Sequence, residues 1–254
     1  MLTILRDTYL IAARDLRLAI RSPQFILVEV LIQPIVFVLL FAYVFGGAIH
    51  VPGMKYVDFL LPGILVQTAA FGSLNTAIAL TEDLKNGLMD RFWSLPMARI
   101  AVVLGRIATD TILAAVGVAV MLIVGILIGF RFHGSVPAAA GAIGVVLLFG
   151  FSFTWLAALL GVALRKPEMV QATGFVAIFP LTFASSAFVP VATMPGWLQA
   201  FAQHTPMTAT VDVVRHLVSG QSVGSELGLA LAWIAAIIVL SGAAANWIYL
   251  RMSR

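Results

Sequence analysis

The chain alternates between long apolar runs and short polar segments. Six runs approach or exceed the roughly 20 residues that a helix needs to cross the hydrocarbon core of a bilayer. They are residues 25–45, 57–80, 107–130, 137–164, 169–189 and 227–250. None shows the regular alternation of apolar and polar positions that is typical of membrane β-barrel strands. The pattern predicts an all-α integral membrane protein, a six-transmembrane-helix bundle that forms one domain over residues 1–254.

The largest polar segment on the predicted inner side lies between the second and third runs. Thr81 fits the N-cap of a new helix over 82–95, with Glu82 and Asp83 in the first turn, where acidic groups favour the helix dipole. Pro96 ends it, because the residue before a proline is disfavoured in the helical conformation. Apolar residues recur on one face of this helix: Leu84, Leu88, Phe92 and Leu95. Such a helix is suited to docking on a partner protein.

Residues 4–21 predict a helix before the first span, so that 1–24 forms an amino-terminal interfacial helix. On a helical wheel one arc is free of charge: Leu5, Tyr9, Ala12, Leu16, Ala19 and Ile20. We expect this arc to lie on the inner leaflet. The alternative is a plain juxtamembrane basic segment. A cleaved signal peptide is disfavoured because the apolar run starts only at Phe25 and is too long for a signal core.

The stretch 195–219, before the last run, predicts outer re-entrant or interfacial helices. Thr205 fits an N-cap, Pro206 the first helical position and Gly220 the position after the helix end. Four apolar residues share a face of this helix: Met207, Val211, Val214 and Val218. Asp212 and Arg215 fall on other faces, so we expect an amphipathic helix at the outer interface.

Composition supports the membrane assignment and sets its orientation. Apolar residues make up 61% of the chain and charged residues 10%, whereas soluble domains carry about 25% charge. Most of the 15 lysine and arginine residues fall in inner segments, and the outer segments keep only Lys55, Arg131 and Arg215. The positive-inside rule therefore places both termini in the cytoplasm of a multi-pass protein. The basic residues form no clustered stripe, so we expect membrane lipids, and no nucleic acid, as partners.

Polar residues within the runs are candidates for a transport pathway or gate. Glu29 and Gln33 lie one turn apart in the first span, and Gln67 and Asn75 make the second span comparatively polar. Glu29 could equally have a structural role, since it lies about one turn from the boundary. Arg106 and Asp110 are spaced for an i,i+4 pair, which more often stabilises a helix than forms a gate. The chain has no cysteine, which excludes thiolate metal sites, and we expect no metal site and no catalytic residue.

Two segments carry distinctive motifs. The inner segment has Glu82-Asp83, Gly87, Met89-Asp90-Arg91-Phe92, Ser94-Leu95-Pro96 and Arg99. The outer segment has Phe188-Val189-Pro190, Met194-Pro195-Gly196-Trp197-Leu198, Pro206-Met207-Thr208 and Val211-Asp212-Val213-Val214-Arg215. Both segments resemble the type-2 ABC exporter permeases, the membrane subunits of the ABC-2 family, and most of all their daunorubicin-resistance type.

The resemblance implies that 82–95 is the coupling helix, which docks on a separate ABC ATPase subunit, and that a second copy or a related permease completes the transporter. The implied coupling residues are Glu82, Asp83, Gly87, Asp90, Arg91, Phe92, Pro96 and Arg99. The sequence contains no G-x-x-x-x-G-K-[ST] phosphate loop, so this chain binds no cofactor of its own and ATP and Mg belong to the ATPase partner.

The sequence thus favours a transport permease, not an enzyme, for an amphiphilic drug, lipid or glycolipid, in the cytoplasmic membrane of a bacterial cell. A polysaccharide or glycoconjugate exporter permease is the first alternative. A membrane-embedded lipid-modifying enzyme, or a channel or carrier that works without ATP, are alternatives of other classes. The enzyme would need nucleophile, acid, base or metal ligands clustered at one depth, and the sequence shows no such cluster.

Overall fold

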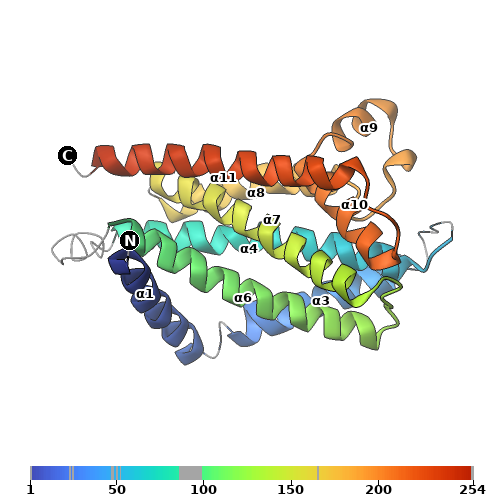
Figure 1. Ribbon diagram of the computed structural model, residues 1–254, viewed down its shortest axis with the longest axis horizontal. Coiled ribbons are helices and arrows are strands. Elements are labelled where there is room, and N and C mark those ends of the chain that lie inside the picture. The colour runs from blue at the N-terminus through green and yellow to red at the C-terminus, as the bar shows by residue number, and fades with distance from the viewer. Residues whose placement is uncertain are drawn as a thin grey trace.

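The protein is a bundle of long helices that run along its longest axis (Figure 1). The computed structural model describes residues 2–22, 24, 26–46, 49, 51, 53–85, 99–164 and 166–252. Over these residues the regular structure is helical, without a strand. The prediction of an all-α protein is therefore confirmed.

Five helical segments are long and apolar enough to cross a membrane: 26–44, 56–83, 101–127, 136–164 and 225–245. The first is built from the π-helix η1 (Ile26–Ile32), α3 (Gln33–Leu40) and the π-helix η2 (Phe41–Phe45). The others lie in α4 (Tyr56–Lys85), α6 (Arg99–Leu127), α7 (Val136–Leu164) and α11 (Ser225–Met252). A multi-pass membrane protein follows from these segments.

The predicted span over 169–189 is shorter than expected. Helix α8 (Pro167–Phe183) has 17 residues and ends before Ala184. Beyond it, the Ser185 hydroxyl donates to the Thr182 carbonyl at 2.5 Å and accepts from the Ala187 N–H at 3.2 Å. Side chains that bond nearby backbone groups compete with helix continuation. The apolar composition up to Val189 could not reveal this local competition.

Helix α4 passes through the predicted N-cap at Thr81 without a break and continues to Lys85. The prediction that a new helix begins there is wrong. The Thr81 hydroxyl donates to the Ala77 carbonyl one turn earlier, at 2.7 Å, and also lies 3.3 Å from the Gly161 carbonyl of α7. A threonine that bonds to the preceding turn can stay inside a helix. Glu82 and Asp83 therefore belong to the last turns of α4.

Helix α1 (Leu2–Arg21) packs against α6 at the end of the bundle where α11 finishes (Figure 1). Ile11 is buried, and a Cβ added at Gly105 of α6 would lie only 2.7 Å from its Cβ. The Thr109 hydroxyl donates to the Ala12 carbonyl at 3.2 Å. Leu5 and Tyr9, which belong to the predicted apolar arc, are exposed instead of buried against the bundle. The helix thus has one face on the bundle and an apolar face left open.

At the opposite end, α9 (Gly196–Ala202) leads into α10 (Pro206–Ser219). The predicted ends of α10 are confirmed: Thr205 caps it by accepting from the Thr208 N–H at 3.2 Å, and Gly220 follows with a left-handed φ of 74°. Two faces of α10 are buried. One packs Met207 and Val211 on the core of α4 and α7, and the other packs Ala209 and Val213 on α7 and α11.

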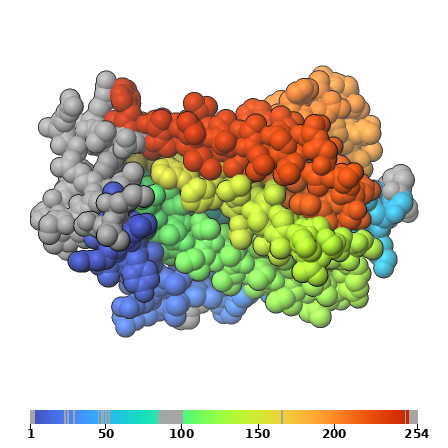
Figure 2. All heavy atoms as spheres, in the orientation of Figure 1, coloured from blue at the N-terminus to red at the C-terminus, as the bar shows by residue number. Residues whose placement is uncertain are grey.

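Helices α4 and α7 form the centre of the bundle. Large side chains such as Leu60, Ile64 and Phe149 are fully buried between them and their neighbours. At Gly161 a Cβ would lie 2.8 Å from the Ala77 carbonyl oxygen, so a glycine lets the two backbones approach closely. Figure 2 shows α11 and α10 covering the upper part of one face and α6 and α7 its lower part.

Candidate functional site

A cavity of about 480 Å³ lies between the first span, α4 and α8. We call it the amide cavity, after four side chains in its lining: Gln33, Gln67, Asn75 and Gln171. The rest of its lining is largely apolar and aromatic: Pro34, Phe37, Thr68, Phe71, Gly72, Leu74, Ile78, Phe175, Phe179 and Phe183. Three of the four predicted pathway residues therefore meet in one place.

The spacing of these residues explains why they share a cavity. On α4 the sequence places Gln67, Phe71 and Asn75 four residues apart, and on α8 it places Gln171 and then three phenylalanines at the same interval. Residues four apart lie on one face of a helix. Two such stripes therefore face each other across the cavity. Gln171 was not predicted, although this spacing was available in the sequence.

Gln67 is the most buried of the four amides, with 5% of its surface exposed. Its Oε1 atom has no hydrogen-bond partner among the described residues. A buried polar atom left without a partner costs about 1–3 kcal/mol. Gln33, Asn75 and Gln171 are exposed by comparison. The cavity therefore has a buried acceptor, able to bind a hydrogen-bond donor that enters from outside.

Aromatic rings form a continuous ladder beside the amides. Neighbouring ring centres lie 5.2 Å apart for Phe175 and Phe179, 4.4 Å for Phe179 and Phe183, and 5.1 Å for Phe183 and Phe188. The ladder continues to the first span, where Phe188 stacks on Phe41 at 4.5 Å. Stacked and tilted ring pairs present broad apolar faces. The cavity thus combines an apolar wall with a few hydrogen-bonding groups.

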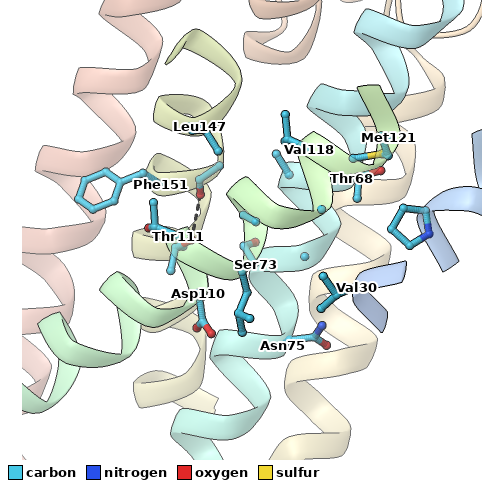
Figure 3. Close-up of a pocket in the computed structure, with 18 residues that line it drawn as sticks. Val30, Thr68, Ser73, Asn75, Asp110, Thr111, Val118, Met121, Leu147 and Phe151 are labelled. Carbon is cyan, nitrogen blue, oxygen red and sulfur yellow. Dashed lines mark hydrogen bonds between the residues drawn. The ribbon is translucent and has the colours of Figure 1, made fainter. Parts of the chain in front are cut away.

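A second cavity of about 110 Å³ adjoins the first and shares Pro34, Thr68, Gly72 and Asn75 with it. Figure 3 shows Asn75 of α4 and Asp110 of α6 at one end of this cavity, and Val118 and Met121 toward the other. Asp110 accepts from the Thr76 hydroxyl at 2.5 Å and from Arg106 Nε at 3.1 Å. The predicted i,i+4 pair is confirmed, and it also fastens α6 to α4.

The carboxyl-terminal end of α4 carries the first predicted coupling residues. Glu82 is exposed, whereas Asp83 is half-buried and interacts electrostatically with Arg106 of α6 and Arg14 of α1. Burial raises the pKa of the Asp15 carboxyl of α1, and the same two arginines oppose the rise. Five predicted coupling residues lie outside the described residues: Gly87, Asp90, Arg91, Phe92 and Pro96. The backbones of Glu29 and Arg99 belong to η1 and α6, but their side chains are outside the description.

A buried polar network at the opposite end was not predicted. Arg215 donates to Asp212 Oδ1 at 2.9 Å, to the Phe59 carbonyl at 3.0 Å and to the Ser186 carbonyl at 2.9 Å. The Ser186 hydroxyl also donates to Asp212 Oδ1, at 2.7 Å. The network ties α10 to α4 and to the turn after α8. The sequence placed Arg215 away from the apolar face of an amphipathic interfacial helix, but its side chain is only 11% exposed.

Burial affects both charged groups of this network. It lowers the pKa of Arg215 to about 10, although Asp212 opposes the change. It raises the pKa of the Asp212 carboxyl, against the hydrogen bond from Ser186 and the charge of Arg215. Each charge is stable in this position because the other is present.

Several helices long and apolar enough to cross a membrane surround an amphiphilic cavity, an arrangement that suits a membrane transport protein. The sequence profile of the ABC-2 type transporter family matches residues 6–218. The chain therefore belongs to this family, as the resemblance implied, and is an ABC transporter permease.

Three related proteins agree with the family assignment. The daunorubicin resistance ABC transporter permease protein DrrB1 of Streptomyces coeruleorubidus is 35% identical over 214 residues, which cover 84% of this chain and 76% of the relative. The probable doxorubicin resistance ABC transporter permease protein DrrC of Mycobacterium tuberculosis is 28% identical over 214 residues, 83% of this chain and 76% of the relative. The putative transport permease ycf38 of Cyanophora paradoxa is 28% identical over 200 residues, which cover 77% of this chain and 69% of the relative.

Proposed function

We propose that this chain exports an amphiphilic, drug-like molecule through the amide cavity, with ATP hydrolysed by a separate ATPase subunit that holds ATP and Mg. The observation that carries the proposal is the buried acceptor of Gln67 inside a largely apolar, aromatic-walled cavity. A cargo that stacks on the phenylalanines and donates to Gln67 Oε1 would satisfy both features at once. The names of the relatives, which refer to resistance to daunorubicin and doxorubicin, favour a drug over a polysaccharide.

The lining of the cavity also limits its cargo. It contains no aspartate, glutamate, lysine or arginine among the described residues. A charged group is costly to bring into such surroundings unless a partner of opposite charge is present. We therefore expect the uncharged part of the cargo to occupy the cavity, and any charged part to remain near its mouth.

We further propose six crossings with both termini in the cytoplasm of a bacterial cell, with α8 as the fifth span. Helix α1 begins and α11 ends at the same end of the bundle (Figure 1), as an even number of crossings requires. The exposed apolar face of α1 suits an interfacial helix on the inner leaflet. The two buried faces of α10 favour a re-entrant helix over one that lies on the surface.

Partners follow from the family and from the geometry. The ATPase is proposed to dock at the inner end of α4, around the exposed Glu82. A second copy or a related permease is proposed to close the amide cavity, because its α8 side exposes Phe175 and Phe179. Both partners are those that the resemblance implied, an ATPase subunit and a second permease.

The experiment is ATP-driven uptake of fluorescent amphiphiles, doxorubicin first, into inside-out membrane vesicles that contain the chain and its ATPase partner. ATP-dependent accumulation supports the proposal, and vesicles with an ATPase inactive in hydrolysis serve as the control. Accumulation that is the same with the inactive ATPase would contradict an ATP-driven exporter. Failure across a panel of drugs, lipids and glycolipids, with the complex intact, would overturn the assigned cargo class.

A further inference from the structure

A second large hollow, of about 580 Å³, lies on the other side of α8. We call it the α9 groove. Helices α7, α8 and α11 form its walls and α9 with the start of α10 its rim. Its lining residues are Phe153, Leu156, Ala177, Ile178, Leu181, Ala200, Phe201, His204, Thr205, Pro206, Trp233 and Ile237. It shares no lining residue with the amide cavity.

The polar groups of the α9 groove are already engaged. The Thr205 hydroxyl donates to the Ala202 carbonyl at 3.0 Å and accepts from the Thr208 N–H at 3.2 Å. His204 Nδ1 lies 2.8 Å from the Ala200 carbonyl oxygen, and since a carbonyl only accepts, Nδ1 carries the proton. Apart from Nε2 of the exposed His204 and the indole N–H of Trp233, every side-chain polar atom in the lining has a hydrogen-bond partner among the described residues. The interior of the groove suits hydrocarbon.

The depth of the groove matches one leaflet of a bilayer. Trp233 and Ile237 lie eight and twelve residues after Ser225, the first residue of α11, which corresponds to about 12 and 18 Å along the helix. Half of the ~30 Å hydrocarbon core is about 15 Å. The groove therefore extends from the α9 end of the membrane-crossing helices to about the middle of the bilayer.

Helix α9 has the features of a segment at the membrane interface. Trp197 is 76% exposed and Phe201 is 49% exposed. Tryptophan is enriched at the boundary between acyl chains and head groups. Phe201 lines the groove, and the polar Gln203 and His204 follow it directly and are exposed. A molecule seated in the groove would thus have its polar end beside these two residues.

We propose that the α9 groove binds one acyl chain of a membrane lipid from the leaflet on the α9 side, with the head group beside Gln203 and His204. The site is separate from the cargo cavity and does not depend on what the protein exports. A bound chain fills the space between α8 and α11, which the described side chains leave open, and so supports the start of α10.

The test uses the purified protein in nanodiscs whose lipids carry bromine on the acyl chains, because bromine quenches a tryptophan that it touches. The contribution of Trp233 is obtained by comparing the wild type with Trp233→Phe. Ala177→Phe places a ring in the groove, and the matched control is Val176→Phe, at an exposed neighbour outside the lining. Ala200→Phe fills the groove from the other side if Ala177→Phe fails to fold.

We expect brominated lipid to quench Trp233 strongly in the wild type and in Val176→Phe, and at least twofold less in a groove-filling variant. Native mass spectrometry after detergent exchange should retain one lipid per chain in the wild type and lose it in that variant. Quenching that is equal in all variants, with no retained lipid, would show only ordinary surrounding lipid and overturn the site. Absence of quenching in the wild type would also overturn it, and would favour a protein surface in the groove.

Discussion

The guanidinium of Arg215 lies 3.8 Å from the centre of the Phe59 ring and donates two hydrogen bonds, at 3.0 and 3.3 Å, to the Phe59 carbonyl oxygen. The cation interacts with the ring face while its N–H groups bind the backbone of the same residue. Phe59 lies one turn before Pro62, inside α4. This contact therefore holds α10 against the first turns of α4.

Replacement of Arg215 should destabilise the protein strongly. In Arg215→Met the Asp212 carboxylate, 34% exposed, loses its cationic partner but keeps the hydrogen bond from Ser186. The cost should therefore be at or below the lower end of the roughly 3–5 kcal/mol typical of a fully buried pair. The expected result is a clear fall in the thermal unfolding midpoint in detergent. The double variant Arg215→Met with Asp212→Asn removes both charges and should recover a large part of the loss. A double variant no more stable than Arg215→Met would show that charge pairing is not what the contact supplies.

Gln67→Leu should separate stability from transport. The change removes a buried acceptor that has no partner, so the stability of the free protein should be unchanged or raised by up to about 1–3 kcal/mol. Transport of a hydrogen-bond-donating cargo should fall about tenfold, since the cargo loses its buried partner. The measurements are thermal unfolding and vesicle uptake on the same preparation. Leu65→Met, a buried change on α4 outside the cavity lining, is the control. Normal uptake by Gln67→Leu would remove Gln67 from the pathway.

Glu82→Lys and Asp83→Lys should behave differently, although the two residues are neighbours. Glu82 is exposed, so its reversal should leave the membrane level intact and weaken co-purification of the ATPase by opposing a charged partner surface. Asp83→Lys would place a third cation with Arg14 and Arg106 and should lower stability as well. Lys55→Glu, at an exposed residue just before the opposite end of α4, controls for charge reversal as such. ATPase recovery that is normal with Glu82→Lys would contradict docking at this end.

Asp15→Asn should change the pH dependence of stability. Because burial raises the pKa of Asp15, its contribution is fully present below the ordinary value of 3.8 and is lost as pH rises through the higher pKa of the folded state. Asparagine has no charge to lose. The unfolding midpoint of the variant, relative to wild type, should therefore increase between pH 4 and pH 7. If the difference in unfolding midpoint between variant and wild type stays constant over this pH range, burial of the charged carboxylate does not control the pH dependence of stability. Glu168→Gln, at an exposed carboxylate, is the control for charge removal.

The absence of native cysteine allows the proposed topology to be mapped with single cysteines. Cysteines at the exposed Ser135 and Ser222 should react with an impermeant thiol reagent from outside intact cells. A cysteine at Lys85 should react only after permeabilisation. Labelling at Lys85 in intact cells would reverse the orientation, and protection of Ser222 would show a different number of crossings after α7.

Five of the six spans could be predicted because crossing a bilayer requires a long apolar run, which a single sequence displays directly. Gln33, Gln67 and Asn75 could be predicted as well, since polar residues stand out within such runs. Their meeting around the unpredicted Gln171 depends on how α8 packs on α4, which no local pattern specifies.

The end network shows the opposite case. The sequence placed Arg215 away from the apolar face of its helix but did not indicate its burial. Its partners include the backbone carbonyls of Phe59 and Ser186, which are far from it in sequence. Carbonyl groups are present at every position, so a sequence cannot mark which of them a side chain will reach. The break in helix α8 and the continuity of α4 at Thr81 were missed for a related reason. In both cases the outcome depends on which nearby backbone carbonyl accepts a hydrogen bond from one hydroxyl, that of Thr81 in α4 or that of Ser185 after α8.

The continuity of α4 has a mechanical consequence. Its 30 residues form a single rod about 45 Å long, with Glu82 near one tip, the amide cavity along its shaft and the Arg215 contact near the other tip. If the ATPase docks at the Glu82 tip as proposed, a movement of that tip tilts the helix, and Pro62, where a backbone hydrogen bond is missing, is the natural pivot. We expect spin labels at Lys85 and Ser222 to change their separation on ATP binding by the partner. Pro62→Ala, which stiffens the pivot, should make that change smaller.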